Sequence, residues 1–434
     1  MPHVALVPLV GVRVADPELR ALGLTLPGLR DRTRALGNLP ALGLLTLAGL
    51  TPRHWTQSWH PAAVCTYLPA ELARLRPDLV AVSALTASIT EAYALCDALR
   101  ALGLRTVLGG LHATALPAEA EQHADAVVVG EGEPVWQTVL SDCERGALQR
   151  RYVAPRADLG AAPLPAWRLA GALSRYSLQT QRGCPFACEF CGASRLLGPF
   201  REKPLARIED ELAQLAALSP RPVIELADDN TFAGHRDHAA LLDVLRQRGA
   251  RWFSEADWRI GEQPHLLVLL AASGCVQLLV GVESLAHAFR GMGAKGVELP
   301  RVLRAIEAIQ AAGVAVNACF VVGADGESEA SLAALAELVG RGPFADVQLT
   351  LQTPFPGTAL RARLEAEGRL LPGAGWDHHT LFDLCFVPDN LPAETLHARF
   401  KSLVALAYSS AARKRRARIR REVWRGNTGL HPWD

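Results

Sequence analysis

The stretch YSLQTQRGCPFACEFCGASRLLGPFREKP, Tyr176 to Pro204, decides how the whole chain is interpreted. It brings Cys184, Cys188 and Cys191 into one short segment, with Phe190 directly before the last cysteine. Three thiols this close suit a metal or a metal cluster better than a disulfide, which would leave one thiol over. The spacing therefore predicts a metal site with thiolate ligands.

Composition sets the frame for that site. The chain has 434 residues, of which 50% are apolar, enough for two or three domains with a large core. The 45 Lys and Arg residues balance 44 Asp and Glu residues, so the net charge gives no general reason to expect a nucleic acid partner. The opening residues MPHVALVPLVGV show no signal-peptide pattern, and we expect a reducing cytoplasm, where thiolates persist.

The other six cysteines are scattered and mostly lie in apolar runs, so we expect small buried side chains at Cys65, Cys96, Cys143, Cys275, Cys319 and Cys385. One apolar stretch, HLLVLLAASGCVQLLVGVES, approaches the length of a membrane span. Ser273, Gly274 and Gln277 interrupt it. It predicts a helix, a glycine turn and a buried strand, and no transmembrane segment.

The first 150 residues alternate short apolar runs with helical patterns. Runs such as LVAVSAL and DAVVVGEGE are apolar throughout, which is typical of parallel strands covered on both faces. We expect residues 1–150 to form a doubly wound, Rossmann-like parallel sheet. Ligands of such sheets bind beyond the carboxyl ends of the strands, where the sequence places small residues: Ser83, Gly109, Gly110, Gly130 and Gly132.

The rest of the chain divides into three parts. Residues 151–175 contain three prolines and no sustained periodicity, which predicts a linker. Residues 176–365 show six strand-and-helix units, which predict a partial (β/α)6 TIM-like barrel with functional loops at the strand ends. Residues 366–434 predict a helical cap and a basic, solvated amphipathic tail, with a surface for an acidic partner or lipid as the alternative.

The cysteine pattern C-x3-C-x2-C lacks a fourth ligand nearby, which a structural zinc site would need. A 4Fe–4S cluster held by three cysteines keeps one iron open to another ligand. With the aromatic Phe190, the motif closely resembles that of the radical S-adenosylmethionine (SAM) superfamily. The resemblance implies that the open iron binds SAM, and that one electron cleaves it to a 5′-deoxyadenosyl radical. A three-cysteine zinc site completed by a distant ligand is the alternative.

Four further segments resemble the same superfamily. IELADDN implies that Asp228 and Asp229 meet the SAM amino group, and VGVES implies that Glu283 and Ser284 lie near its ribose or carboxylate. FVVGADGES, with Gly323, is similar to the glycine motif beside the adenine. TPFPGT, with Pro354, is similar to a segment of the cobalamin-linked branch. For each segment alone, a strand end finishing in turn residues is the alternative.

The front of the chain resembles a cobalamin (B12) binding domain, on the stretches Leu39 to Leu50 and Gly109 to Glu133. The resemblance implies cobalamin between the front sheet and the barrel, with its tail passing the small residues at the strand ends. No D-x-H-x-x-G motif follows the first strand, so we expect no histidine ligand of the usual kind below the cobalt. We expect His112 to be a strand-end histidine that satisfies backbone groups, with metal ligation as the alternative. His378, His379 and Trp376 are candidates to line a substrate pocket.

These resemblances imply an enzyme with a 4Fe–4S cluster, SAM and cobalamin, and an external electron donor such as flavodoxin or ferredoxin. The function expected first is C-methylation of an unactivated carbon in a small molecule or natural product. Radical cyclisation or rearrangement in the same fold, either with or without cobalamin, is the alternative. A methylthiotransferase-like RNA modifier fits less well, because that class resembles chains with three more front cysteines and a C-terminal β-barrel. A sensor without turnover would not need the full set of SAM-contacting strand ends.

Overall fold

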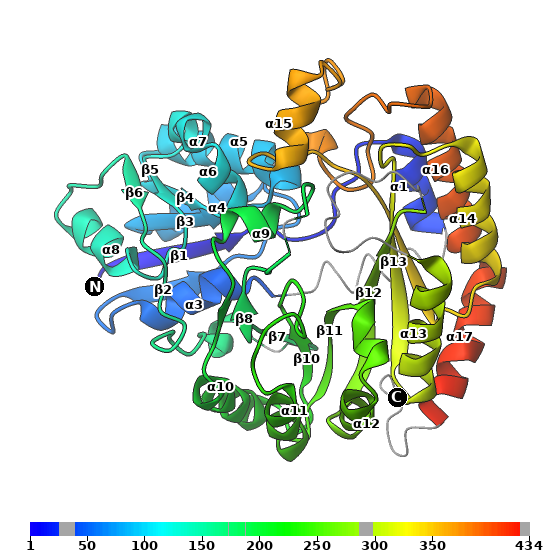
Figure 1. Ribbon diagram of the computed structural model, residues 1–434. Helices are drawn as coiled ribbons and strands as arrows, with labels where there is room; N and C mark the ends of the chain where they lie inside the picture. Colours follow the sequence, from blue (N-terminus) through cyan, green and yellow to red (C-terminus); the bar gives the residue numbers. More distant parts are fainter. Residues whose placement is uncertain (26–39, 172, 187, 286–297, 426–434) are drawn as a thin grey trace.

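The computed structural model describes residues 1–25, 40–171, 173–186, 188–285 and 298–425 (Figure 1). Ala187 of the cysteine stretch, Leu39 of the front motif and the tail after Arg425 lie outside the described residues. Two six-stranded sheets and a small two-stranded ribbon make up the strands in the described ranges. The expected α/β class with two parallel sheets is confirmed.

The front sheet has the strand order β2-β1-β3-β4-β5-β6, and every neighbouring pair is parallel. Its strands are β1 (His3–Pro8), β2 (Thr56–Trp59), β3 (Leu79–Ser83), β4 (Thr106–Gly109), β5 (Ala126–Val129) and β6 (Arg151–Val153). The order reverses between β1 and β3, which is the switch point where doubly wound sheets bind ligands.

Helices cover both faces of the front sheet, as its apolar strands require. One core packs the sheet against α4 (Leu68–Leu75), α5 (Ile89–Ala101), α6 (Leu111–Ala115) and α7 (Pro117–His123). The other core packs it against α3 (Leu42–Leu50) and α8 (Trp136–Glu144). The doubly wound prediction is therefore confirmed.

Two strands of the front sheet differ from expectation. β6 lies at Arg151–Val153, so the sheet continues into the segment that the sequence assigns to the linker. β2 is the short polar run TQSW at the sheet edge, with only partial burial, and it carries no apolar signal. An edge strand needs little apolar character because only one side of it is paired.

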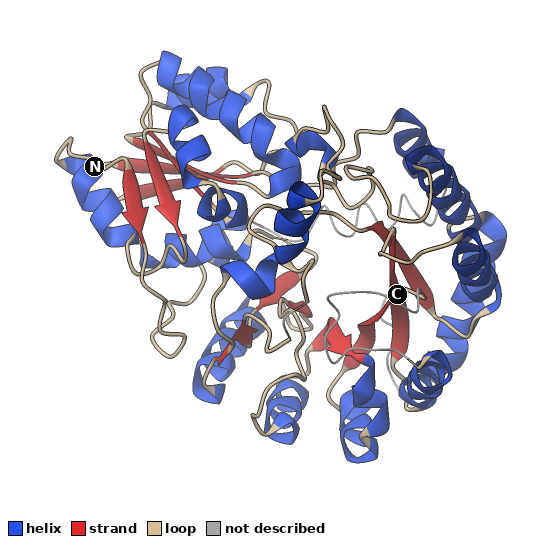
Figure 2. Cartoon of the chain, turned by 45° about the horizontal axis from the view of Figure 1, so that its top comes forward, coloured by secondary structure: helices blue, strands red, loops and turns tan. Residues whose placement is uncertain are grey.

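The second sheet runs in the order β14-β13-β12-β11-β10-β7, all parallel and open at both edges. Its strands are β7 (Tyr176–Leu178), β10 (Val223–Leu226), β11 (Arg251–Asp257), β12 (Cys275–Glu283), β13 (Ala315–Val322) and β14 (Asp346–Leu351). Helices follow its outer face: α10 (Leu205–Leu218), α11 (His238–Gln247), α12 (Pro264–Ala272), α13 (Leu299–Ala311) and α14 (Glu329–Arg341) (Figure 2). This is the expected partial barrel.

The longest apolar stretch divides as predicted into α12, a turn at Gly274 with φ = 88°, and the buried strand β12. In the part of the chain that the structure describes, no helix combines the length and the apolarity needed to cross a membrane. Four of the six scattered cysteines are buried, whereas Cys65 and Cys319 are partly exposed.

The last helices are α15 (Ala359–Ala366), α16 (Ala393–Ala407) and α17 (Ser410–Arg425). The basic helix α17, expected to be solvated, also packs against the rest of the protein. Arg416 is buried and donates to the Ala407 carbonyl at 2.5 Å, and Arg415 donates to the Gly342 carbonyl at 2.9 Å. Trp424 is buried and donates to the Val276 carbonyl at 3.0 Å, so this helix is fastened to the barrel.

Candidate functional site

The three motif cysteines lie on the loop between β8 (Gln181–Arg182) and α9 (Gly192–Leu196), on the carboxyl side of β7. Cys188 is buried, and Cys184 and Cys191 are partly exposed. The Cys191 N–H donates to the Cys188 carbonyl at 3.3 Å. Among the described residues, no three Cys, His, Asp or Glu side chains already converge on one metal position. The loop thus offers a donor set of three thiols on one short segment.

The barrel fastens this loop through α15. Phe190 packs against the apolar cluster of Leu360, Leu364 and Phe386. The Leu360 N–H donates to the Glu189 carbonyl at 3.0 Å, and the Glu189 carboxylate pairs with Arg363 at 2.6 Å. Phe190 is thus an anchor between the cysteine loop and α15.

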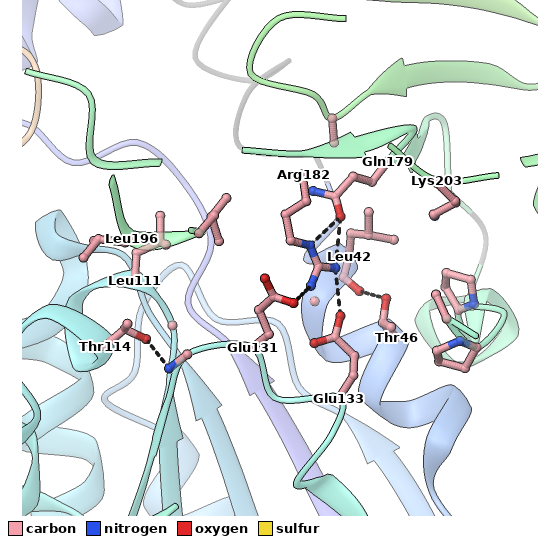
Figure 3. A pocket seen from close by; sticks show the side chains of 18 of the residues that line it. Leu42, Thr46, Leu111, Thr114, Glu131, Glu133, Gln179, Arg182, Leu196 and Lys203 are labelled. Atoms are coloured by element: carbon pink, nitrogen blue, oxygen red, sulfur yellow. Dashed lines mark hydrogen bonds and ion pairs between the residues drawn. The ribbon is translucent and has the colours of Figure 1, made fainter. Parts of the chain in front are cut away.

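The front domain fastens the loop from its other side. Arg182 in β8 and Arg201 in β9 (Arg201–Glu202) are paired across the ribbon, one before the three cysteines and one after them. Arg182 pairs with Glu131 at 2.9 Å and with Glu133 at 2.8 Å (Figure 3). Arg201 also pairs with Glu131. The two glutamates of the GEGE segment after β5 therefore hold both ends of the cysteine loop.

Glu131 is ionised in this setting. Burial acts to raise the pKa of Glu131, but the hydrogen bonds from Arg201 and the charge of Arg182 lower that pKa below its usual range. Sequence reasoning missed this contact. The available signal was the pair of carboxylates at a strand end, together with an arginine on each side of the cysteine loop.

A cavity of about 300 Å³ lies where the front domain meets the barrel (Figure 3). From the front domain, α3 contributes Leu42 and Thr46, and the loop after β5 contributes Glu131. From the barrel side, Gln179 and Arg182 line it. The cavity therefore opens between the two sheets, beside the segment that carries the three cysteines.

A second cavity of about 170 Å³ lies between the front sheet, α3 and α8. All five small residues expected at the strand ends line it: Ser83, Gly109, Gly110, Gly130 and Gly132. The two cavities have Gly43, Gly110, Gly130 and Glu133 in common, so they adjoin. Together they offer a broad space at the domain junction and a narrower slot along the sheet.

Two adjacent glycines shape this slot differently. A Cβ at Gly109 would meet only the Val128 side chain within 4 Å, at 3.8 Å, so the glycine leaves room beside it. Gly110 has φ = 115°, and a Cβ there would lie 2.7 Å from the Ala84 carbonyl oxygen. Gly110 is therefore required by the backbone, whereas Gly109 leaves the slot open.

At the end of β10 the two expected aspartates have separate surroundings. Asp228 is buried and accepts hydrogen bonds from the Thr180 N–H at 2.7 Å and the Thr180 hydroxyl at 2.6 Å. It also accepts from the Gln181 N–H at 3.1 Å and the Thr231 hydroxyl at 3.1 Å. Asp228 thus ties the ends of β7 and β10 together.

Asp229 is partly exposed, and it lines a cavity of about 180 Å³ together with Asp228, Glu225, Ser254 and Glu255. Burial, followed by the charge of Asp228, raises the pKa of Asp229 to about 6. Of the two aspartates, Asp229 is the more exposed, and its carboxylate would gain from a cationic partner.

Glu283 ends β12 in an uncommon backbone conformation, with φ = 68°. A Cβ at Gly281 would lie 2.4 Å from the Glu283 carboxylate, so the Glu283 side chain lies over that glycine. Such strain at a strand end is frequent at ligand sites. Ser284 follows it and is also buried.

Gly323 and Pro354 lie at the ends of β13 and β14. A Cβ at Gly323, which has φ = 92°, would lie 3.1 Å from both Leu396 and Phe386, so the C-terminal cap packs over this glycine. Pro354 is buried, and its carbonyl accepts from Arg361 at 3.4 Å. The structure thus places both residues against α15 or the cap.

The remaining candidates form a contact between the cap and the front domain. His112, in α6, is fully buried and lies 3.2 Å from the Thr86 hydroxyl and 3.4 Å from the Glu119 carboxylate. Burial lowers the pKa of His112, which favours a neutral ring. Trp376 donates to Glu119 at 2.9 Å and packs edge-on to His112, with His379 on its other side.

His112 is thus paired within the fold, but the expectation of backbone partners is wrong, because its ring contacts the side chains of Thr86 and Glu119. Trp376 and His379, expected as possible pocket residues, lie in this contact between the cap and the front domain. His378 is partly exposed and pairs with its neighbour Asp377 at 3.1 Å.

Comparison with known proteins identifies the two domains that contain the sheets. The family model of the B12 binding domain matches residues 32–140, and that of the radical SAM superfamily matches residues 178–339. The bacteriochlorophyllide d C-12(1)-methyltransferase of Chlorobaculum tepidum is 25% identical over 383 residues, covering 86% of this chain and 83% of the relative. The anaerobic magnesium-protoporphyrin IX monomethyl ester cyclase of Cereibacter sphaeroides is 25% identical over 358 residues, with coverages of 73% and 58%.

Solved structures agree on the fold. The methyltransferase TsrM of Kitasatospora setae, solved with cobalamin and a 4Fe–4S cluster, has a TM-score of 0.68 at 16% identity, covering 98% of this chain and 99% of TsrM. The cobalamin-dependent SAM radical enzyme OxsB, solved with aqua-cobalamin and SAM, has a TM-score of 0.69 at 13% identity. The match covers 93% of this chain and 66% of OxsB.

The chain is a radical SAM superfamily enzyme with an N-terminal B12-binding domain. The cofactors of this class are a 4Fe–4S cluster, SAM and cobalamin.

Proposed function

We propose that the protein is a cobalamin-dependent radical SAM C-methyltransferase acting on an unactivated carbon of a small molecule. The observation that carries this proposal is the pair of adjoining cavities between the B12-binding domain and the barrel, beside the cysteine loop. The names of the C. tepidum relative and of TsrM, both methyltransferases, support it.

Each cofactor has residues suited to it. Cys184, Cys188 and Cys191 would hold the cluster, because thiolates are its usual ligands. The slot along the front sheet would hold the cobalamin tail, because its glycines let a ligand approach the backbone. No protein ligand to the lower face of cobalt is proposed, so binding would rest on burial and backbone contacts.

Around SAM, Asp229 would accept from the amino group, and Glu283 and Ser284 would face the ribose or carboxylate. Gly323 would lie beside the adenine, where the C-terminal cap packs over it. Pro354 would border the cofactors at the end of β14. When bound, the cluster and SAM supply a 5′-deoxyadenosyl radical using one electron from a donor of the flavodoxin or ferredoxin class, and cobalamin carries the methyl group.

The chain's own contribution is alignment and exclusion of water. Phe190, Arg182 and Arg201 hold the cysteine loop between the two domains, and the cavities adjoin at that point. Fixing reacting groups in one geometry removes much of the entropic barrier to their reaction.

The test is anaerobic purification from cells supplied with cobalamin, followed by a visible spectrum and product analysis with SAM and a reductant. We expect close to one corrinoid per chain, and both 5′-deoxyadenosine and S-adenosylhomocysteine as products. S-adenosylhomocysteine reports loss of a methyl group from SAM, so its absence with a candidate substrate present would overturn methyl transfer.

Radical cyclisation is the second candidate, favoured by the similarity to the Cereibacter sphaeroides cyclase. It would need no methyl group from SAM. A preparation that contains corrinoid and forms 5′-deoxyadenosine, but no S-adenosylhomocysteine, would select this function.

A further inference from the structure

Two arginines enclose the cysteine loop. Arg182 precedes all three cysteines and Arg201 follows them, and the two residues stand opposite each other in the β8–β9 ribbon. Like charges directly opposite each other destabilise a ribbon. An anion between them removes this repulsion, and the front domain supplies one at Glu131.

The Glu131 carboxylate is itself held in place. Its side chain is 7% exposed, and it also accepts a hydrogen bond from the Ala157 N–H at 2.8 Å. Gly130, directly before it, has φ = 91°, and its N–H donates to the Thr114 hydroxyl at 3.0 Å. Three parts of the chain therefore meet at one carboxylate: the end of β5, the segment after β6, and the ribbon.

This contact also borders the proposed cofactor space. Glu131, Glu133 and Arg182 all line the cavity at the domain junction, with their charged groups directed toward one another (Figure 3). The barrel holds the other side of the same loop through Glu189 and Arg363. The loop is thus held to the barrel by the Glu189–Arg363 pair, and its position relative to the front domain depends on the contact at Glu131.

We propose that Glu131 is a positioning residue that holds the cysteine loop against the B12-binding domain through Arg182 and Arg201. Removing its charge takes away the carboxylate that the two facing arginines share, so that of its two carboxylate partners Arg182 keeps only Glu133, and it loosens the attachment of the loop to the front domain. The consequence for turnover rests on the proposed function, whereas the effect on the loop does not.

The first test is hydrogen exchange of residues 183–200 in the full chain without added cofactor. Glu131→Gln keeps the shape and removes the charge, and we expect about tenfold faster exchange in this segment, because local opening becomes easier. The core strands β3 and β13 should exchange as in the wild type. Glu131→Asp should restore most of the protection, since it restores the charge.

The matched control is Glu91→Gln. Glu91 forms a two-point ion pair with Arg13 inside the front domain, with both hydrogen bonds at 2.7 Å. This change should leave exchange at residues 183–200 unaltered. Equal exchange of this segment in the wild type and Glu131→Gln, or equal acceleration by Glu91→Gln, would overturn the proposal.

A second set of variants guards against misfolding of Glu131→Gln. Arg201→Lys keeps the charge but loses the planar fork that contacts two carboxylate oxygens. We expect about threefold faster exchange in the segment, and no further acceleration when Arg201→Lys is combined with Glu131→Gln, because both break one contact. If the double variant exchanged faster by the product of the two single effects, the two residues would not act through one shared contact.

With cofactors present, the readout is the ratio of 5′-deoxyadenosine to methylated product. A loosened loop should raise this ratio at least threefold in Glu131→Gln, while the KM for SAM stays within about twofold. A wild-type enzyme that forms no methylated product would refute the proposed function and leave the exchange result standing on its own.

Discussion

The Asp228 carboxylate accepts hydrogen bonds from the Thr180 N–H at 2.7 Å and from the Thr180 hydroxyl at 2.6 Å, and so joins the end of β10 to the end of β7. Both aspartates line the same cavity, but Asp228 is buried, whereas its neighbour Asp229 is partly exposed. We therefore expect the two carboxylates to have different tasks: Asp228 holds the fold, and Asp229 is the proposed contact to SAM.

Asp228→Asn should lower stability by about 2 kcal/mol, because an amide turned toward Thr180 leaves buried donors unsatisfied. Asp229→Asn should change stability little and weaken SAM binding. Chemical denaturation and SAM titration of both variants provide the check. Equal loss of SAM affinity in the two, at equal stability, would contradict this division.

SAM binding should depend on pH through Asp229, whose pKa is about 6 in the free protein. Above that pH the carboxylate is ionised and attracts the SAM amino group, whereas below it the group is protonated and neutral. We therefore expect affinity to fall about tenfold for each pH unit below 6. Asp229→Asn should flatten the profile, and an unchanged slope in that variant would assign the effect to another group.

Gly109→Val should reduce the corrinoid content while the melting temperature stays close to that of the wild type, because its side chain enters the slot along the front sheet. Gly110→Ala is the matched contrast. Its Cβ would meet the Ala84 carbonyl at 2.7 Å at a positive φ, so the melting temperature should fall. Full corrinoid content in Gly109→Val would remove this slot as the tail site.

Trp424→Ala should cost about 3 kcal/mol of stability, because a large buried side chain and its bond to the Val276 carbonyl are lost. Arg421→Ala, on the exposed face of α17, should change stability by less than about 0.5 kcal/mol. Urea denaturation of both variants tests whether the basic helix is a structural part of the barrel.

Much of the fold was predictable because its strands are apolar and buried. The six barrel strands and the helix, turn and strand around Gly274 follow the periodicity of the sequence. β2 was missed because TQSW is a short polar edge strand. β6 was missed because its three residues follow a basic run at the start of the linker.

The site was predictable at the level of motifs and less so at the level of side chains. The alternation of burial along β10 continues past its end at Leu226, so that Asp228 is buried and Asp229 is partly exposed. This difference between the aspartates could have been inferred from the sequence. The pairing of Glu131 with Arg182 was harder to infer: both charged segments are visible in the sequence, but nothing in it indicates that these parts of two domains meet.

The cap contact made by Trp376 has a consequence for protein engineering. Besides the covalent linker, the contacts that join the front domain to the rest of the molecule include the Glu131 pair with Arg182, the Trp376 bond to Glu119 and the Asp16 pair with Lys401. A chimera that takes its B12-binding domain from a relative would have to import matching partners for residues 182, 201 and 376 as well. A domain swap in this enzyme must therefore transfer the front domain together with the residues of the barrel and cap that contact it.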